Sequence, residues 1–247
     1  MGYHDDTSEL TKTALNVFVD SPYEYYLQFE TRQMKQREQT KPMITGIVQH
    51  AMFLEQKKLD DLVAVYTSEC FKKDKKSLNP KPAEAFRLAN AGKFCMKERE
   101  RDNIAETYDR LKDSAIAHAI AECSEFEKTK RATVYGVPCK CKPDIAGDIG
   151  ESWVVYDLKF TDSIAGFVKT SRSFRYWLQD AHYSAVIQEL TGKPVVFKFI
   201  AAETVFPYRV RIYEYDGIKR EMAARFHKSK VLDFAACRRS KVWPDRF

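Results

Sequence analysis

Residues 141–160 read CKPDIAGDIGESWVVYDLKF, and the architecture of the chain can be inferred outward from this segment. The sequence is strand-like from Thr133 to Phe160, with an apolar run at residues 153–156 that is typical of a sheet core. Gly147-Asp148 and Gly150-Glu151 supply a turn between two strands. The pattern therefore predicts an antiparallel hairpin.

The predicted hairpin brings three charged side chains together. Asp144 belongs to its first strand, and Asp157 and Lys159 belong to its second strand. Because side chains alternate along a strand, Asp157 and Lys159 share one face while Leu158 faces the other way. Two carboxylates suit Mg²⁺, which polarises a phosphoryl oxygen and activates a bound water, and a lysine can stabilise developing charge. The alternative is a surface hairpin with an incidental Asp–Lys pair.

The chain on either side of the hairpin predicts a mixed α/β domain with a central sheet. Ser21-Pro22-Tyr23-Glu24 starts one upstream helix, with Ser21 as its cap and Glu24 closing a capping box. The other expected helices are 11–20, 43–57, two or more within 83–124, 173–190 and 217–237, and the expected later strands are 195–202 and 208–215. Residues 31–42 and 72–82 are polar and basic and are expected to be loops.

Composition is that of an ordinary globular protein. The 247 residues are 44% hydrophobic and 31% charged, and 41 Lys+Arg against 35 Asp+Glu give a net charge of +6. There is no run of about 18 apolar residues, so no membrane helix is expected. The acidic N-terminus lacks the apolar region of a secretory signal, so we expect a cytoplasmic protein with reduced thiols.

The six cysteines include Cys139 and Cys141, which share a face of a predicted strand. The favoured interpretation is that both are small buried hydrophobic residues. A C-x-C pair by itself does not make a closed zinc site, which needs four ligands.

Two helices carry further polar residues. His50 shares a helical stripe with Gly46 and Ile47, where a hydrogen-bonded core histidine is the simpler interpretation. Gln179 and Tyr183 are four residues apart and therefore lie on one helix face, which could also be a polar helix end in solvent.

In combination, these motifs resemble a known superfamily. The P-D-x(12)-D-L-K pattern, the G-x-x-x-H helix and the Q-x-x-x-Y pair resemble the PD-(D/E)XK nucleases of the RecB-like branch. Ser21-Pro22, Lys140-x-Lys142-Pro143-Asp144 and Trp243-Pro244 extend the likeness to RecE-type (exodeoxyribonuclease VIII) nuclease domains over nearly the whole chain. The resemblance implies a PD-(D/E)XK fold, a central mixed β-sheet flanked by helices, as a single domain. Its parts would be a helical region 1–130, a catalytic sheet core 131–216 and a C-terminal basic helix 217–247.

The resemblance also implies site residues by position. Lys159 would be the catalytic lysine, and Gln179 and Tyr183 would support the site or contact the DNA backbone. The implied metal ligands are His50, Asp144, Asp157, the backbone carbonyl of Leu158 and Glu125, with Glu122 and Glu127 as alternatives to Glu125.

The implied activity is a Mg²⁺-dependent exonuclease, with Mn²⁺ as a substitute ion. It would digest linear double-stranded DNA from 5′ ends and leave 3′ single-stranded tails in phage-type recombination. Such enzymes act with a single-strand annealing protein, and relatives form ring homo-oligomers, so we expect a tetramer.

Basic residues are expected to contact DNA phosphates, above all Lys169, Arg172 and Arg175 near the Gln179 helix. Other candidates are Lys35, Arg37, the lysines of 72–76 and the series from Lys228 to Lys241. Each such run is more often just a solvated face.

Two other functions remain open. A Cas4- or AddB-like nuclease would need an iron–sulfur cluster, but only Cys237 follows the Q-x-x-x-Y helix, so no cluster is expected. A DNA-end-binding module without turnover is the non-enzymatic alternative.

Overall fold

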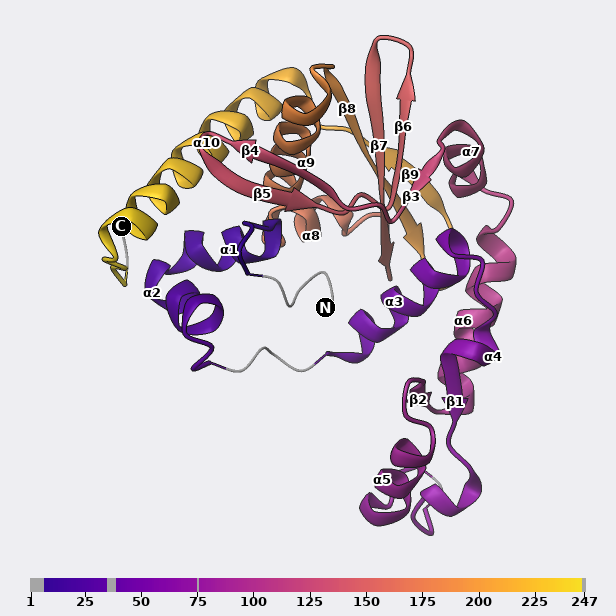
Figure 1. The fold of residues 1–247 in the computed structure, drawn as a ribbon. Coiled ribbons are helices and arrows are strands. Elements are labelled where there is room, and N and C mark those ends of the chain that lie inside the picture. Colours follow the sequence, from indigo (N-terminus) through magenta and orange to yellow (C-terminus); the bar gives the residue numbers. More distant parts are fainter. Residues whose placement is uncertain (1–6, 35–38, 75, 246–247) are drawn as a thin grey trace.

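The computed structural model describes residues 7–34, 39–74 and 76–245. A five-stranded mixed sheet of order β3-β6-β7-β8-β9 forms its centre (Figure 1). Its strands are β3 (Glu125–Phe126), β6 (Ile145–Ile149), β7 (Ser152–Thr161), β8 (Val195–Glu203) and β9 (Val210–Tyr213). Only the β7–β8 pair is parallel, and the other neighbours are antiparallel.

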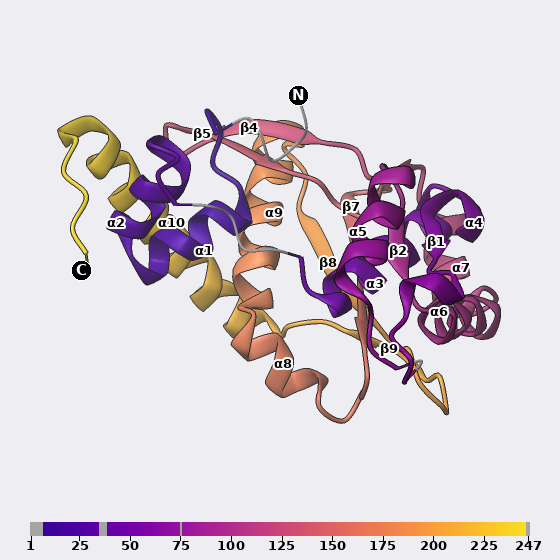
Figure 2. The same cartoon turned by 90° about the horizontal axis from the view of Figure 1, so that it is seen from below.

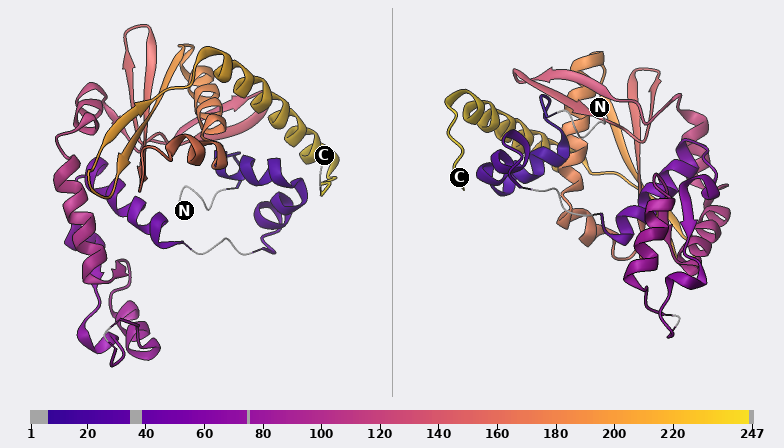
Figure 3. Two further views of the ribbon diagram at one scale, coloured as in Figure 1. Left: turned by 180° about the vertical axis from the view of Figure 1, so that it is seen from behind. Right: turned by 60° about the horizontal axis from the view of Figure 1, so that its bottom comes forward.

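Helices lie along both sides of this sheet (Figures 2 and 3). Their bounds are Lys12–Asp20 (α1), Pro22–Tyr25 (α2), Lys41–Leu54 (α3), Leu59–Leu62 (α4), Pro80–Ala89 (α5), Glu98–Leu111 (α6), Ala115–Glu122 (α7), Phe167–Ser173 (α8), Tyr176–Thr191 (α9) and Gly217–Ser240 (α10). A π-helical turn, Tyr26–Glu30 (η1), follows α2, and a 3-10 turn, Ser68–Cys70 (η2), precedes α5.

The alternation of side chains along β7 separates two hydrophobic cores. Val155 faces the core built with α1, α9 and α10, where Leu178 and Phe234 are fully buried. Val154 and Leu158 face the opposite core, where Phe53 of α3 and Ile116 of α7 pack against the sheet. One strand thus contributes to both layers, as its unbroken apolar run requires.

The predicted hairpin is β6–β7, with Ile149 paired to Ser152 across a two-residue turn. Only Gly150-Glu151 forms that turn, and Gly150 has a φ of +63°, which favours glycine. Gly147 and Asp148 lie within β6, so their assignment to the turn was wrong. A Cβ on Gly147 would come within 3.2 Å of the Cα of Cys123, which explains the glycine inside the strand.

A second hairpin, β4 (Lys130–Val134) and β5 (Val137–Cys141), packs on α9. Cys139 and Cys141 are both fully buried, and all six cysteines are free thiols. The interpretation of this pair as small core residues is therefore confirmed.

The ends of the described chain meet beside α10. Phe18 and Tyr25 contact Phe234 and Trp243 through edge and stacked ring contacts. The Oγ of Ser21 accepts a hydrogen bond of 3.1 Å from the amide of Glu24, as expected for a cap.

Several predicted boundaries differ from the structure. The expected loop 72–82 ends early because Pro80 starts α5, a position at which proline is well tolerated. The expected helix 173–190 is two helices, α8 and α9, broken at Arg175 with φ 51°. The helix expected at 43–57 spans Lys41–Leu54, and the last helix extends to Ser240.

One sheet was not predicted. Strands β1 (Val63–Val65) and β2 (Phe94–Met96) pair in parallel and, with α5, project away from the central sheet in Figure 1. Throughout the described ranges, no helix is long and apolar enough to span a membrane.

Candidate active site

Strand β7 carries the centre of the site. Asp157 and Lys159 share one face of it and form an ion pair, as predicted. Asp144 lies one residue before β6 rather than on the strand, but the hairpin register still places it opposite Asp157. The amide of Leu158 donates a 2.7 Å hydrogen bond to Oδ2 of Asp144.

Helix α3 brings His50 against this strand. Its Nε2 lies 3.2 Å from the carbonyl oxygen of Leu158, and its Nδ1 lies 3.6 Å from Oδ1 of Asp144. The same Nδ1 is 3.7 Å from Oε1 of Glu127. The ring also has an edge-to-face contact with Phe160, which orients it.

His50, Glu127 and Asp144 make a donor set for a metal ion. Their ligand atoms all lie within 4.8 Å of one another. One imidazole nitrogen and two hard carboxylate oxygens suit a divalent cation such as Mg²⁺ or Mn²⁺. The Leu158 carbonyl, which the resemblance implies as a further ligand, lies beside Nε2 of His50.

Asp157 forms the other half of the site. The residue is 1% exposed, and its carboxylate is held by the amide nitrogen of Gln179 and the ammonium of Lys159. Gln179 lies on α9, which packs against the sheet. The predicted Gln179 therefore contacts the predicted Asp157 directly.

The acidic residue beside His50 is Glu127 rather than Glu125. Glu125 lies on β3, and its carboxylate binds Lys130. Glu127 follows β3 with φ 51°, and its carboxylate binds Lys142 and faces His50. Glu125 and Glu127 are two positions apart, so strand alternation places both side chains on the same face. Alternation alone therefore could not show which of the two enters the site. The turn after Phe126 directs only the second one to the site.

Tyr183 lies one turn beyond Gln179 on α9 and contacts the backbone before Asp144. Its hydroxyl donates to the carbonyl of Lys142 at 3.5 Å, and its ring packs edge-on against Phe197. It thus supports the backbone that leads into Asp144.

Burial and charge shift the protonation of the site. Burial raises the pKa of Asp144 to about 7, against the opposing charge of His50. Burial also works against the charged form of His50, but Asp144 and Glu127 outweigh it and raise the pKa of the imidazole. For Lys159, the carboxylates of Asp157 and Asp144 overcome burial and raise the pKa of the ammonium. Lys159 is therefore protonated at neutral pH.

The predicted DNA-binding residues divide into two kinds. Lys169 and Arg172 are exposed on α8. Arg175 is instead committed to an ion pair with Asp20 of α1. Lys35 and Arg37 lie outside the described residues.

Comparison with solved structures supports the fold. A candidate exonuclease from Eubacterium rectale aligns with a TM-score of 0.68 at 17% identity, over 99% of this chain and 87% of that chain. SSO0001 aligns with a TM-score of only 0.39 at 12% identity, over 92% of this chain and 77% of that chain. No curated protein matches the sequence.

A family model described as a PDDEXK-like domain of unknown function (DUF3799) matches residues 13–247. The predicted PD-(D/E)XK fold, a mixed sheet flanked by helices, is thereby confirmed. The chain belongs to the PDDEXK-like family DUF3799.

Proposed function

We propose that this protein is a divalent-metal-dependent exonuclease that hydrolyses the phosphodiester bonds of linear double-stranded DNA. The observation that carries the proposal is the convergence of Asp144, Asp157 and Lys159 with His50 at the β6–β7 hairpin. The alternative of an incidental surface Asp–Lys pair does not explain why Asp157 is buried and held by Gln179.

The residues present fit a metal ion, as the donor set of His50, Glu127 and Asp144 indicates. These three would hold Mg²⁺ or Mn²⁺, with Asp157 and the Leu158 carbonyl as adjacent oxygen donors. The ion would polarise a phosphoryl oxygen and lower the pKa of a bound water.

The remaining side chains of the site stabilise negative charge, hold other groups in place or bind the DNA backbone. Lys159, protonated at neutral pH, stabilises negative charge that develops on the phosphate, a role of preorganised electrostatics rather than of a general base. Gln179 orients Asp157 through its amide, and Tyr183 holds the backbone at Lys142. The exposed Lys169 and Arg172 on α8 supply backbone contacts to DNA.

Finer features of the proposal rest on resemblance to RecE-type domains. They are digestion from 5′ ends, 3′ single-stranded tails, a ring-shaped tetramer and a single-strand annealing partner in recombination. The E. rectale neighbour, itself a candidate exonuclease, supports the exonuclease class.

The test is digestion of linear and closed circular duplex DNA with Mg²⁺, with Mn²⁺ and with EDTA. We expect loss of the linear form only, abolished by EDTA and by Asp157→Asn. Duplex labelled at the 5′ or the 3′ end gives the polarity, and light scattering gives the oligomeric mass. Cutting of the circle would indicate an endonuclease, and binding of ends without hydrolysis in either metal would indicate a DNA-end-binding module.

A further inference from the structure

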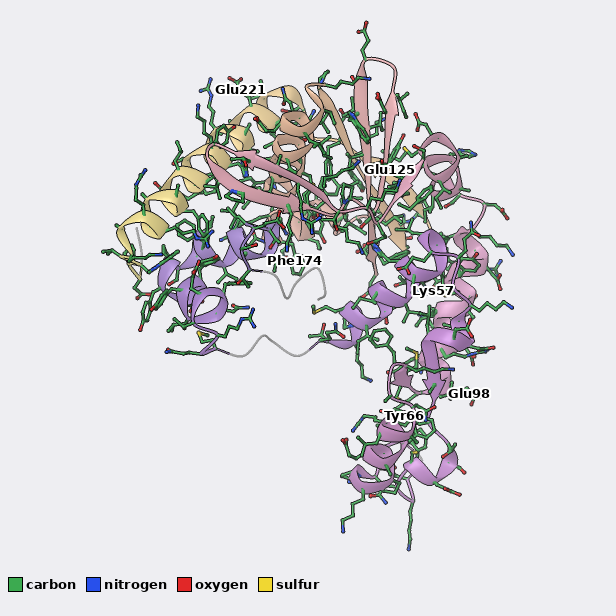
Figure 4. All side chains as sticks on the ribbon, viewed as in Figure 1. Lys57, Tyr66, Glu98, Glu125, Phe174 and Glu221 are labelled. Carbon is green, nitrogen blue, oxygen red and sulfur yellow. The ribbon has the colours of Figure 1, made fainter. Side chains whose placement is uncertain are left out.

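Helix α1 carries a second lysine to the candidate active site. Lys12, the first residue of α1, is partly buried, and its Nζ donates a 3.2 Å hydrogen bond to the backbone carbonyl of Phe174, which Figure 4 labels. The same ammonium lies 5.9 Å from the ring centroid of Tyr176. The ammonium of Lys159 lies 4.9 Å from that ring. Two lysines from different elements, α1 and β7, therefore approach one aromatic ring.

This position is electrostatically unfavourable for a lysine. Lys12 stands at the positive end of the α1 dipole, and the first turn of that helix has no acidic residue. Burial and the charge of Lys159 lower the pKa of Lys12 to about 8, against the attraction of Asp157. An anion placed between the two ammonium groups would relieve this repulsion.

Arg175 holds α1 in the position that brings Lys12 to the site. It adopts φ 51°, in the left-handed region that costs a non-glycine residue free energy. Its guanidinium donates to the carboxylate of Asp20 and, at 3.4 Å, to the carbonyl of Asn16. Arg175 thus links the second half of α1 to the α8–α9 junction. Lys12 links the first turn of α1 to the carbonyl of Phe174, the residue before Arg175. Arg175 is a positioning residue for Lys12.

We propose that Lys12 is a phosphate-binding residue of the active site, whose ammonium binds a phosphate of the DNA strand next to the phosphate held by Lys159. The proposal rests on the proposed function and names a contact beyond the family motifs. An ammonium has three hydrogens, and the Phe174 carbonyl takes one, so Lys12 can also donate to phosphate oxygens. The phosphate is either the terminal 5′ monoester of a duplex end or an internal diester of the same strand.

The first test measures binding of a labelled duplex by fluorescence anisotropy, with Ca²⁺ in place of Mg²⁺, over a range of salt concentrations. Lys12→Gln keeps a donor for the Phe174 carbonyl and removes the charge, whereas Lys12→Arg keeps the charge. Loss of one phosphate contact makes the plot of log affinity against log salt concentration less steep by about 0.9. The same loss weakens binding about tenfold near 0.1 M salt. We expect this for Lys12→Gln and a wild-type slope for Lys12→Arg.

The matched control is Lys112→Gln, which removes an exposed lysine at the C-terminal cap of α6 that forms a 3.2 Å ion pair with Asp109. It should leave the slope unchanged. An unchanged melting temperature shows that each variant is folded. A Lys12→Gln protein that is folded and has the wild-type slope and affinity would overturn the proposal.

The second test separates the two phosphate sources by digestion of duplexes with 5′-phosphate or 5′-hydroxyl ends. A rate loss confined to the phosphorylated ends supports the terminal monoester, and an equal loss on both supports the internal diester. If the wild-type protein binds duplex but hydrolyses nothing, the nuclease function fails while the binding test of Lys12 still stands. If the wild type digests DNA and Lys12→Gln binds and digests equally well, only the role of Lys12 fails.

Discussion

The amide of Leu158 donates a hydrogen bond of 2.7 Å to Oδ2 of Asp144, so the backbone between Asp157 and Lys159 anchors the carboxylate on the neighbouring strand. This bond uses the second oxygen of Asp144 and leaves the first one facing His50. The hairpin itself therefore orients the carboxylate oxygen that we propose as a metal ligand, without help from a distant loop.

This relationship predicts the behaviour of Asp144→Asn. The amide oxygen can still accept from Leu158, so the variant should fold and melt within a few degrees of the wild type. Without the negative charge, Mn²⁺ affinity should fall about a hundredfold or more, because even indirect partners of metal ligands are worth 10–100-fold. Isothermal titration calorimetry measures the Mn²⁺ affinity of the variant and of the wild type.

Asp148→Asn is the control for this variant, since Asp148 lies on the same hairpin and pairs with the partly exposed Lys193. It should bind Mn²⁺ like the wild type. Wild-type Mn²⁺ affinity in Asp144→Asn would remove Asp144 from the metal site.

Lys159→Met should separate catalysis from metal binding. The variant removes a charge that stabilises the transition state, so turnover should fall about 10²–10³-fold. Metal affinity should change much less, because Lys159 forms its ion pair with Asp157 and is not one of the three residues whose ligand atoms converge, His50, Glu127 and Asp144. Single-turnover digestion and calorimetry on the same preparation test both statements. A proportionate loss of both would assign Lys159 to assembly of the site instead.

Local periodicity accounts for which side chains of the site share a face, whereas their roles were predicted from the resemblance to PD-(D/E)XK nucleases. The alternation of Asp157, Leu158 and Lys159 is a property of any strand, and the four-residue spacing of Gln179 and Tyr183 is a property of any helix. Pairing across one short turn then places Asp144. These relationships involve neighbouring residues, so one chain is enough to infer them.

The parts that could not be predicted depend on single backbone angles or on long-range contacts. The break at Arg175 has no proline or glycine to signal it, and it is stabilised by Asp20, 155 positions away. The contact of Lys12 with Phe174 spans 162 positions. The β1–β2 pair has three residues per strand, too few for a clear alternation pattern.

Glu127 and Glu125 provide a matched pair of variants. Glu127→Gln removes a carboxylate beside His50 and should lower Mn²⁺ affinity by about 10–100-fold. Glu125→Gln removes a carboxylate bound to Lys130, outside the metal-binding group, and should leave Mn²⁺ affinity unchanged. Calorimetry under identical conditions compares them. If Glu125→Gln weakened Mn²⁺ binding more than Glu127→Gln did, Glu125 rather than Glu127 would be the metal ligand.

A buried histidine pair predicts that acid destabilises the fold. Nε2 of His182 lies 3.2 Å from the carbonyl of Lys140, and its Nδ1 lies 3.1 Å from Nε2 of His227. A carbonyl only accepts, so Nε2 of His182 carries its proton, Nδ1 accepts from His227, and both rings are neutral. Burial lowers the pKa of His182 to about 4 and that of His227 to about 3, from the ordinary 6.5.

The sign of the effect follows from these lowered values. Below about pH 6.5 the unfolded chain binds protons that the folded chain does not, so the free energy of unfolding falls as the pH decreases towards 4. Each histidine contributes up to about 1.4 kcal/mol per pH unit in that window. Urea unfolding at pH 7, 6 and 5 measures the slope. The readout is the difference between variants, because Asp144, with its raised pKa, contributes a slope of opposite sign.

His227→Gln retains a donor near Nδ1 of His182 but cannot titrate in this range, so its slope between pH 6 and pH 5 should be shallower by about 1 kcal/mol per pH unit. His118→Gln removes an exposed histidine of α7 and should keep the wild-type slope. If both variants have the wild-type slope, the buried pair does not set the acid sensitivity. In that case the neutral state of the two rings in the folded protein, on which the tautomer assignment depends, would also have to be abandoned.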